Sequence, residues 1–185
     1  MWGPKAIIKT RLEAFARQFS YDMGYAHQIL DTGMKPFRAF SGLFTLAAYR
    51  DRQLPLAPWF AAKWVATQSE GCGPCQQLTL NMAQQEGMPA SLIKAIKLGD
   101  EQGMGPDAAL AYRWARAVIS PQTAHESAHE ESHEAEQLRQ QIKDKWGARG
   151  LISLTLAMAG ARSFPMIKRA LGHDTVCQLL DDAKP

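Results

Sequence analysis

Apolar residues recur three and four positions apart along most of the chain, and alternation of polar and apolar residues is not sustained in any segment. The first pattern is typical of amphipathic helices and the second of strands. No run rich in Val, Ile, Thr and Tyr is bounded by turn dipeptides either. The sequence therefore predicts an all-α fold. The expected helices of the first two thirds cover residues 7–19, 25–30, 37–49, 59–67, 73–85, 90–98 and 106–119.

The last third of the chain changes character twice. Residues 123–146 are strongly polar, with acidic residues first and basic residues last, which suits the dipole of one long helix. Gly147 and Gly150 then interrupt the pattern. Residues 151–161 are apolar on nearly all sides, which predicts a buried helix, and a short final helix is expected over 164–171.

Length and composition narrow the class of protein. The chain has 185 residues, 46% of them hydrophobic and 21% charged, which is typical of one globular domain. A formal net charge of +3 is too balanced to indicate nucleic-acid binding. The longest weakly polar stretch, Phe40–Tyr49, is about half of the roughly 20 residues that cross a bilayer, so no membrane contact is expected. The first residues show no secretion signal. With three cysteines, an odd number, the chain is expected in the reducing cytoplasm.

The most specific chemical signal is the segment Cys72-Gly73-Pro74-Cys75. Glycine and proline here predict that a helix begins around Gly73 or Pro74, with both cysteines on one face. Unpaired N–H groups and the positive end of the helix dipole stabilise a thiolate there, which favours redox chemistry. Thioredoxins share this motif, but their fold needs a buried strand before it. Two other interpretations stay open: a zinc site, for which Cys177 is the remaining cysteine, and two cysteines that simply pack in the core.

Together with the segments around it, this motif resembles the alkyl hydroperoxidase D (AhpD)-like branch of the carboxymuconolactone decarboxylase superfamily. The order of segments is similar from Ala57 to about Gly172: a helix, the cysteine pair and its helix, the turn at Glu86-Gly87-Met88-Pro89, and further helices. The resemblance implies an all-helical AhpD-like bundle with a family core over residues 55–172. Residues 1–54 are then an N-terminal helical extension.

The resemblance also implies roles for the two cysteines. Cys75 would be the attacking thiolate and Cys72 its resolving partner, cycling through a disulfide with electrons from an external thiol or dithiol. No cofactor is implied, and a homo-oligomer, a trimer or a hexamer, is expected. The sequence departs from the family at the proton relay: Thr79 occupies the position where a histidine is expected, and Phe60 the position where a glutamate is expected. The function indicated is a thiol–disulfide oxidoreductase that reduces alkyl hydroperoxides weakly.

Neighbouring polar residues could compensate for the missing relay. Glu70 is a possible substitute base, although a solvated turn or capping role is the alternative. The Thr79 hydroxyl lies one turn after Cys75 and could donate a hydrogen bond to the thiolate, whereas bonding back to its own helix is the common state. Gln76 and Gln77 could bind a substrate but cannot exchange protons.

Two other classes of function remain open at this point. One is a non-catalytic protein of the same fold, in which the cysteine pair serves as a redox sensor or crosslink on a binding protein. The other is an enzyme of the lactone decarboxylase type, which works without a thiol pair. Survival of activity after both cysteines are replaced would distinguish the second class from a thiol enzyme.

Outside the motif, a row of histidines and the tryptophans deserve a chemical interpretation. His125, His129 and His133 repeat every four residues, and each is followed by a glutamate. Two histidines one helical turn apart can bind zinc, copper or nickel, but an exposed acidic helix face explains the same pattern. The five tryptophans either line an apolar tunnel beside the cysteines or belong to the core. They are Trp2, Trp59, Trp64, Trp114 and Trp146.

Overall fold

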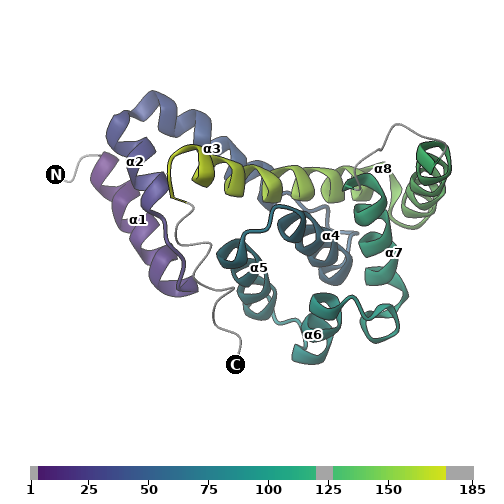
Figure 1. Ribbon diagram of the computed structural model, residues 1–185. Coiled ribbons are helices and arrows are strands. Elements are labelled where there is room, and N and C mark those ends of the chain that lie inside the picture. The colour runs from purple at the N-terminus through teal and green to yellow at the C-terminus, as the bar shows by residue number, and fades with distance from the viewer. Residues whose placement is uncertain (1–3, 120–126, 174–185) are drawn as a thin grey trace.

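The computed structural model describes residues 4–119 and 127–173, with side chains described for all of them except 127–132. Every regular element in this part of the chain is a helix, which confirms the all-α prediction (Figure 1). The helices are α1 (Pro4–Phe19), α2 (Gly24–Thr32), α3 (Met34–Ala48), α4 (Leu56–Ser69), α5 (Gly73–Gln85), α6 (Ala90–Leu98), α7 (Glu101–Ile119) and α8 (Ser127–Ala170). Most bounds lie within a few residues of the predicted ones, and those of α5 and α6 coincide with them.

The last third of the chain differs from the prediction in two respects. The backbone does leave the helical conformation at Gly147, where φ is 68°, but it continues through Gly150 and past Pro165 as part of α8. A separate helix over 164–171 is therefore wrong. Residues 151–161 are also not buried on all sides, since Ile152 is 50% exposed. The reason is that α8 packs against α3, α4 and α7 along one side only.

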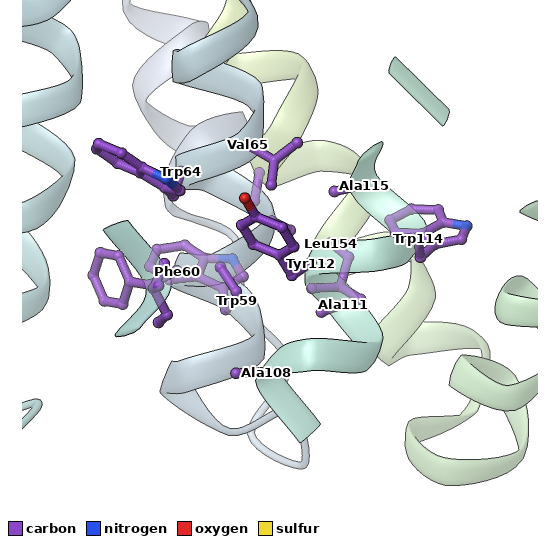
Figure 2. Packing of buried hydrophobic residues seen from close by; sticks show 14 of the residues in the cluster. Trp59, Phe60, Trp64, Val65, Ala108, Ala111, Tyr112, Trp114, Ala115 and Leu154 are labelled. Atoms are coloured by element: carbon purple, nitrogen blue, oxygen red, sulfur yellow. The ribbon is translucent and has the colours of Figure 1, made fainter. Parts of the chain in front are cut away.

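The main core forms around α4, which packs chiefly against α7 and α8. Most of α4 is buried, including the aromatic side chains of Trp59, Phe60 and Trp64 (Figure 2). The facing side of α7 carries small residues at Ala108, Ala111 and Ala115, which let the two helices approach closely. Large side chains on one helix against small ones on the other fill the interface without voids.

A second apolar cluster joins the N-terminal helices to the cysteines. Side chains from α1, α2 and α3 pack there with the last turns of α8 and with Cys72 and Cys75. In Figure 1, α1 to α3 lie at one end of the molecule, next to the end of α8. The first 48 residues thus contribute directly to the surroundings of the cysteine pair.

Helix α8 packs closely against α3 at Gly160. A Cβ atom at this position would lie 2.5 Å from Ala47 Cβ and 2.8 Å from Ala47 Cα. Because a backbone atom cannot rotate away, we expect Gly160→Ala to lower the free energy of unfolding by about 1–3 kcal/mol. Gly42→Ala is the matched control: its Cβ would meet no atom within 4 Å, so a gain of about 0.5–1 kcal/mol is expected. Urea denaturation of both variants tests this, and equal effects would contradict it.

Part of α8 is relevant to the expectation that the chain makes no contact with a membrane. Within the part of the chain described, His133–Ala170 is long and apolar enough to span a membrane by length and composition, although 44% of its most apolar window is buried inside the protein. The core helix of a globular protein passes the same test.

Candidate functional site

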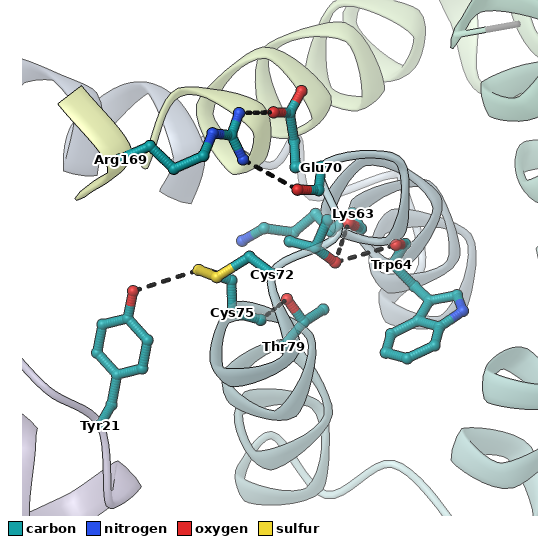
Figure 3. The surroundings of a disulfide bond; sticks show 9 residues. Tyr21, Lys63, Trp64, Glu70, Cys72, Cys75, Thr79 and Arg169 are labelled. Carbon is teal, nitrogen blue, oxygen red and sulfur yellow. Dashed lines mark hydrogen bonds and ion pairs between the residues drawn. A yellow bond between two sulfur atoms is a disulfide. The ribbon is translucent and has the colours of Figure 1, made fainter. Parts of the chain in front are cut away.

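Cys72 and Cys75 form a disulfide at the N-terminus of α5 (Figure 3). Cys72 is the N-cap residue, Pro74 occupies the first turn, and the two Cα atoms lie 5.3 Å apart. The Gln76 N–H donates to the Cys72 carbonyl, the first hydrogen bond of the helix. Both cysteines are almost completely buried, at 2% and 4% exposure. The pair therefore lies at the positive end of a helix dipole but away from bulk water.

A phenol and a buried ammonium accompany the second cysteine. The Tyr21 hydroxyl, from the segment between α1 and α2, lies 3.4 Å from Cys75 Sγ (Figure 3). Lys168 of α8 is fully buried, and its Nζ lies 4.8 Å from the centre of the Tyr21 ring. That nitrogen has no hydrogen-bond partner among the described atoms. An O–H group thus lies beside the sulfur, where it favours an anion, and a buried ammonium packs against the ring that carries this O–H group.

Cys75 lines a cavity of about 480 Å³, whereas Cys72 does not. Aromatic and aliphatic side chains from α1, α3, α4, α5 and α8 form most of the wall. Tyr21 and Tyr25 belong to it, and burial raises the pKa of Tyr25 to about 12. A volume of this size lies within the range of about 300–1,000 Å³ that small-molecule sites occupy. The second sulfur of the motif is therefore the one that a small molecule can reach.

Lys63 places a charge in the wall of this cavity. Its side chain is 6% exposed, its Nζ donates to the Ala47 carbonyl at 3.0 Å, and it lies 3.9 Å from the centre of the Trp59 ring. Burial lowers the pKa of Lys63 to about 8, and the distant carboxylate of Glu86 opposes this only in part. Near neutral pH this ammonium is still charged, but it loses its proton more readily than an exposed lysine.

Glu70 is held by two arginines of α8, so its surroundings do not favour the role of a base. Arg162 Nε donates to one carboxylate oxygen at 2.8 Å. Arg169 donates to the other at 2.7 Å and to the Glu70 carbonyl at 2.9 Å (Figure 3). Burial alone would raise the pKa of Glu70, but these hydrogen bonds outweigh it and the net pKa is lowered. The contact fastens the loop before Cys72 to the end of α8.

Replacement of this carboxylate tests its structural role. A lowered carboxyl pKa contributes stability that is present above the ordinary titration range and is lost as the pH falls through the lowered pKa. We expect Glu70→Gln to lower the free energy of unfolding at pH 7 by about 1 kcal/mol, and by less at pH 3. Glu101→Gln is the control, because its ion pair with Arg113 is exposed and 3.7 Å long. Thermal unfolding at the two pH values gives the answer, and no difference from the control would contradict the role.

The other predicted relay residues have clear positions. Thr79 is buried on the cavity wall, where its hydroxyl donates to the Cys75 carbonyl at 3.0 Å and so bonds back to its own helix. Phe60, at the position where the family resemblance implies a glutamate, lines the same cavity. Gln76 and Gln77 do not line it, and Gln77 donates to Asn81 instead. Both positions of the expected relay thus face the cavity that Cys75 faces.

The structure describes only part of the proposed histidine row. The His133 side chain is exposed, while His125 and the side chain of His129 lie outside the described residues. Within the described residues no group of three or more His, Cys, Asp and Glu side chains is placed to hold a metal ion. Cys177 and Trp2 lie outside that part of the chain as well. Of the tryptophans described, Trp59 lines the cavity, and Trp64, Trp114 and Trp146 are buried in the main core.

Three residues of the site were not predicted from the sequence: Tyr21, Lys63 and Lys168. A signal existed for Lys63, since it is the one charged residue in the apolar stretch from Leu54 to Val65. Tyr21 and Lys168 carry no such signal, because they lie 54 and 93 positions from Cys75 in the chain. Only the fold brings Tyr21 to Cys75 and Lys168 to the Tyr21 ring.

Comparison with known proteins identifies no relative. No family model, no curated protein and no solved structure matches the chain.

Proposed function

We propose that this protein is a thiol–disulfide oxidoreductase that uses Cys72 and Cys75 to reduce small disulfides or, less efficiently, alkyl hydroperoxides. The observation that carries the proposal is the position of Cys75: its sulfur is in disulfide contact with the N-cap cysteine of α5, lies 3.4 Å from a phenol hydroxyl, and borders an apolar cavity. The AhpD-like resemblance supports the same assignment. The chain is then expected to work in the cytoplasm as a trimer or hexamer, without a cofactor.

The chemistry balances with an external dithiol as reductant. The Cys75 thiolate attacks one sulfur of a small disulfide, the S–S bond of the substrate breaks, and one thiolate leaves. Cys72 then attacks Cys75, forms the Cys72–Cys75 bond and releases the second substrate thiol. With a hydroperoxide, Cys75 takes the terminal oxygen, the alcohol leaves, and attack by Cys72 releases water. The dithiol supplies two electrons and two protons to reopen the disulfide and is itself oxidised.

Burial of both sulfurs restricts the substrate to a small molecule. At 2% and 4% exposure, neither sulfur can be attacked by a disulfide on the surface of another protein without a rearrangement. A small molecule that enters the cavity reaches Cys75 first, because Cys72 does not border it. This asymmetry supports Cys75 as the attacking residue and Cys72 as the resolving one.

Tyr21 and Lys168 provide what the missing relay would have provided. The Tyr21 O–H can donate a hydrogen bond to the Cys75 thiolate and can pass a proton to the leaving oxygen or sulfur. The Lys168 ammonium over the Tyr21 ring adds positive charge to the same region. Hydrogen bonds to the charged form and a nearby cation both lower a thiol pKa.

Titration of the reduced protein by thiolate absorbance near 240 nm tests the proposal, with Cys177→Ser as background. We expect Cys75 to titrate well below about 8.5, the ordinary value for a thiol. Tyr21→Phe should move that pKa back toward the ordinary value. Tyr112→Phe is the control, because it removes another buried phenol hydroxyl outside the cavity.

The possible outcomes separate an activated pair from an inert one. Assignment rests on Cys72→Ser and Cys75→Ser, which leave one thiol of the pair each. If both thiols titrate at or above about 8.5, the pair is inert and the enzyme proposal fails. If Tyr21→Phe changes nothing, the thiol remains activated but the role of Tyr21 is wrong.

A further inference from the structure

The cavity beside Cys75 has an unusual distribution of charge. Among its described lining residues, Lys63 carries the one ammonium and Glu86 the one carboxylate, and the rest of the wall is apolar or neutral. Glu86 is exposed at the end of α5, and no ion pair joins it to Lys63. The buried ammonium of Lys63 thus lines the cavity without a carboxylate in contact with it.

The Lys63 ammonium has unused hydrogen-bonding capacity. An ammonium has three N–H donors, and within the described part of the chain one hydrogen bond is formed, to the Ala47 carbonyl. That bond satisfies a carbonyl at the C-terminal end of α3. A neutral group can do the same, since Trp59 Nε1 donates to the neighbouring Tyr49 carbonyl. Capping of α3 therefore accounts for a donor at this position but not for a buried charge.

A buried charge of this kind is costly unless something pairs with it. The lowered pKa of Lys63 reflects that cost. An anion that enters the cavity would offset much of the free energy of burying this charge, because opposite charges attract more strongly in an apolar environment than in water. The wall next to the ammonium is aromatic: the ring centres of Trp59 and Phe60 lie 3.9 and 5.8 Å from Lys63 Nζ.

We propose that this cavity binds an apolar molecule that carries a single carboxylate, with the carboxylate on Lys63 Nζ and the hydrocarbon part against the aromatic and aliphatic wall. Five lining residues supply most of the hydrocarbon contact: Phe15, Met23, Phe44, Leu78 and Phe164. One cation matches one negative charge, and the carboxylate of Glu86 on the wall of the same cavity opposes a ligand with two. A medium-chain fatty acid has the required chemistry.

This inference goes beyond the proposed redox function and does not depend on it. Binding of the acid requires the cavity and Lys63, whereas redox activity requires the two cysteines. If both hold, the substrate of Cys75 is a hydroperoxide or small disulfide of an acid of this class. A protein with inert cysteines would still bind the acid, so failure of one proposal is distinguishable from failure of the other.

Calorimetric titration with decanoic acid and with 1-decanol tests the proposal at pH 7 on the full chain. The alcohol matches the acid in length but has no charge. We expect the wild-type protein to bind decanoate about tenfold more tightly than decanol, and Lys63→Met to abolish that preference while it retains decanol binding. Lys63→Gln, which keeps a donor for the Ala47 carbonyl, should behave like Lys63→Met.

A pH series on the wild-type protein keeps the test decisive even where a variant folds poorly. Besides Lys63, the titratable groups on the cavity wall are Tyr21, Tyr25, Cys75 and Glu86. With Cys75 held in the disulfide, the decanoate affinity should decline between pH 7 and pH 10 as Lys63 loses its proton, while the decanol affinity stays constant. Equal affinity for acid and alcohol, an unchanged acid preference in both Lys63 variants, or no binding of either ligand would overturn the proposal.

Discussion

Cys75→Ser is expected to lower kcat/KM for a small disulfide by at least about a thousandfold, because the hydroxyl that replaces the thiol cannot attack sulfur at neutral pH. The measurement is the consumption of dithiothreitol in the presence of hydroxyethyl disulfide, with Cys177→Ser as background. Cys72→Ser should also stop turnover, but only after the first attack. It should accumulate a mixed disulfide between Cys75 and one half of the substrate, visible by mass spectrometry.

The contrast between the two variants tests which sulfur attacks. Cys75 borders the cavity and Cys72 does not, so the adduct should form in Cys72→Ser and not in Cys75→Ser. Adducts formed equally in both variants would contradict the assignment. Oxidation by one equivalent without further turnover would identify a redox sensor, and activity retained after both substitutions would favour chemistry of the lactone decarboxylase type.

The second large effect is on stability and concerns Lys63. Its pKa is lowered from 10.5 to about 8, so between these values the unfolded chain binds more protons than the folded one. Stability must then rise with pH across this window, and the buried ammonium destabilises the protein at pH 7 by roughly 3 kcal/mol relative to a lysine in water. We expect Lys63→Met to abolish this rise and to gain about 1–3 kcal/mol at pH 7, since the methionine loses the hydrogen bond to Ala47 but buries no charge.

Urea denaturation of both proteins at pH 7, 8, 9 and 10 measures the effect. Tyr25 complicates the upper end, because its pKa is raised to about 12 and the folded state therefore loses stability above about pH 10. The difference between wild type and Lys63→Met cancels this contribution. If the difference in free energy of unfolding between the two proteins stays constant from pH 7 to pH 10, burial of the ammonium does not destabilise the fold.

Helix bounds were predictable because they depend on neighbours in sequence. The glycine and proline between the cysteines set the start of α5, and Gly147 interrupts α8 as expected. The separate helix predicted over 164–171 is instead the end of α8, which continues past Pro165: a helix loses one hydrogen bond at a proline, and α8 packs against α3 and α4. Ile152 was assigned to the core because apolar character alone does not show which side of a helix meets another.

The site was only half predictable for the same reason. The cysteine pair is a local motif, and its reactive position follows from the helix that begins there. Its environment depends on contacts between distant segments: Tyr21 from the segment before α2, Arg169 on the loop at Glu70, and the cavity wall from six helices. Spacing in one sequence carries no record of such contacts, so Glu70 looked free to act as a base although two arginines hold it.

The position of the N-terminal helices has a consequence for the evolution and engineering of this chain. Phe15, Tyr21 and Phe44 form part of the cavity wall, although they precede residue 55, where the resemblance places the start of the family core. A chain that began at residue 55 would keep α4 to α8 but would open Cys75 to solvent and to large reductants. The helices before residue 55 thus restrict access to Cys75. On the proposed function, changes in them would alter which molecules can exchange electrons with the pair without any change in the cysteine motif.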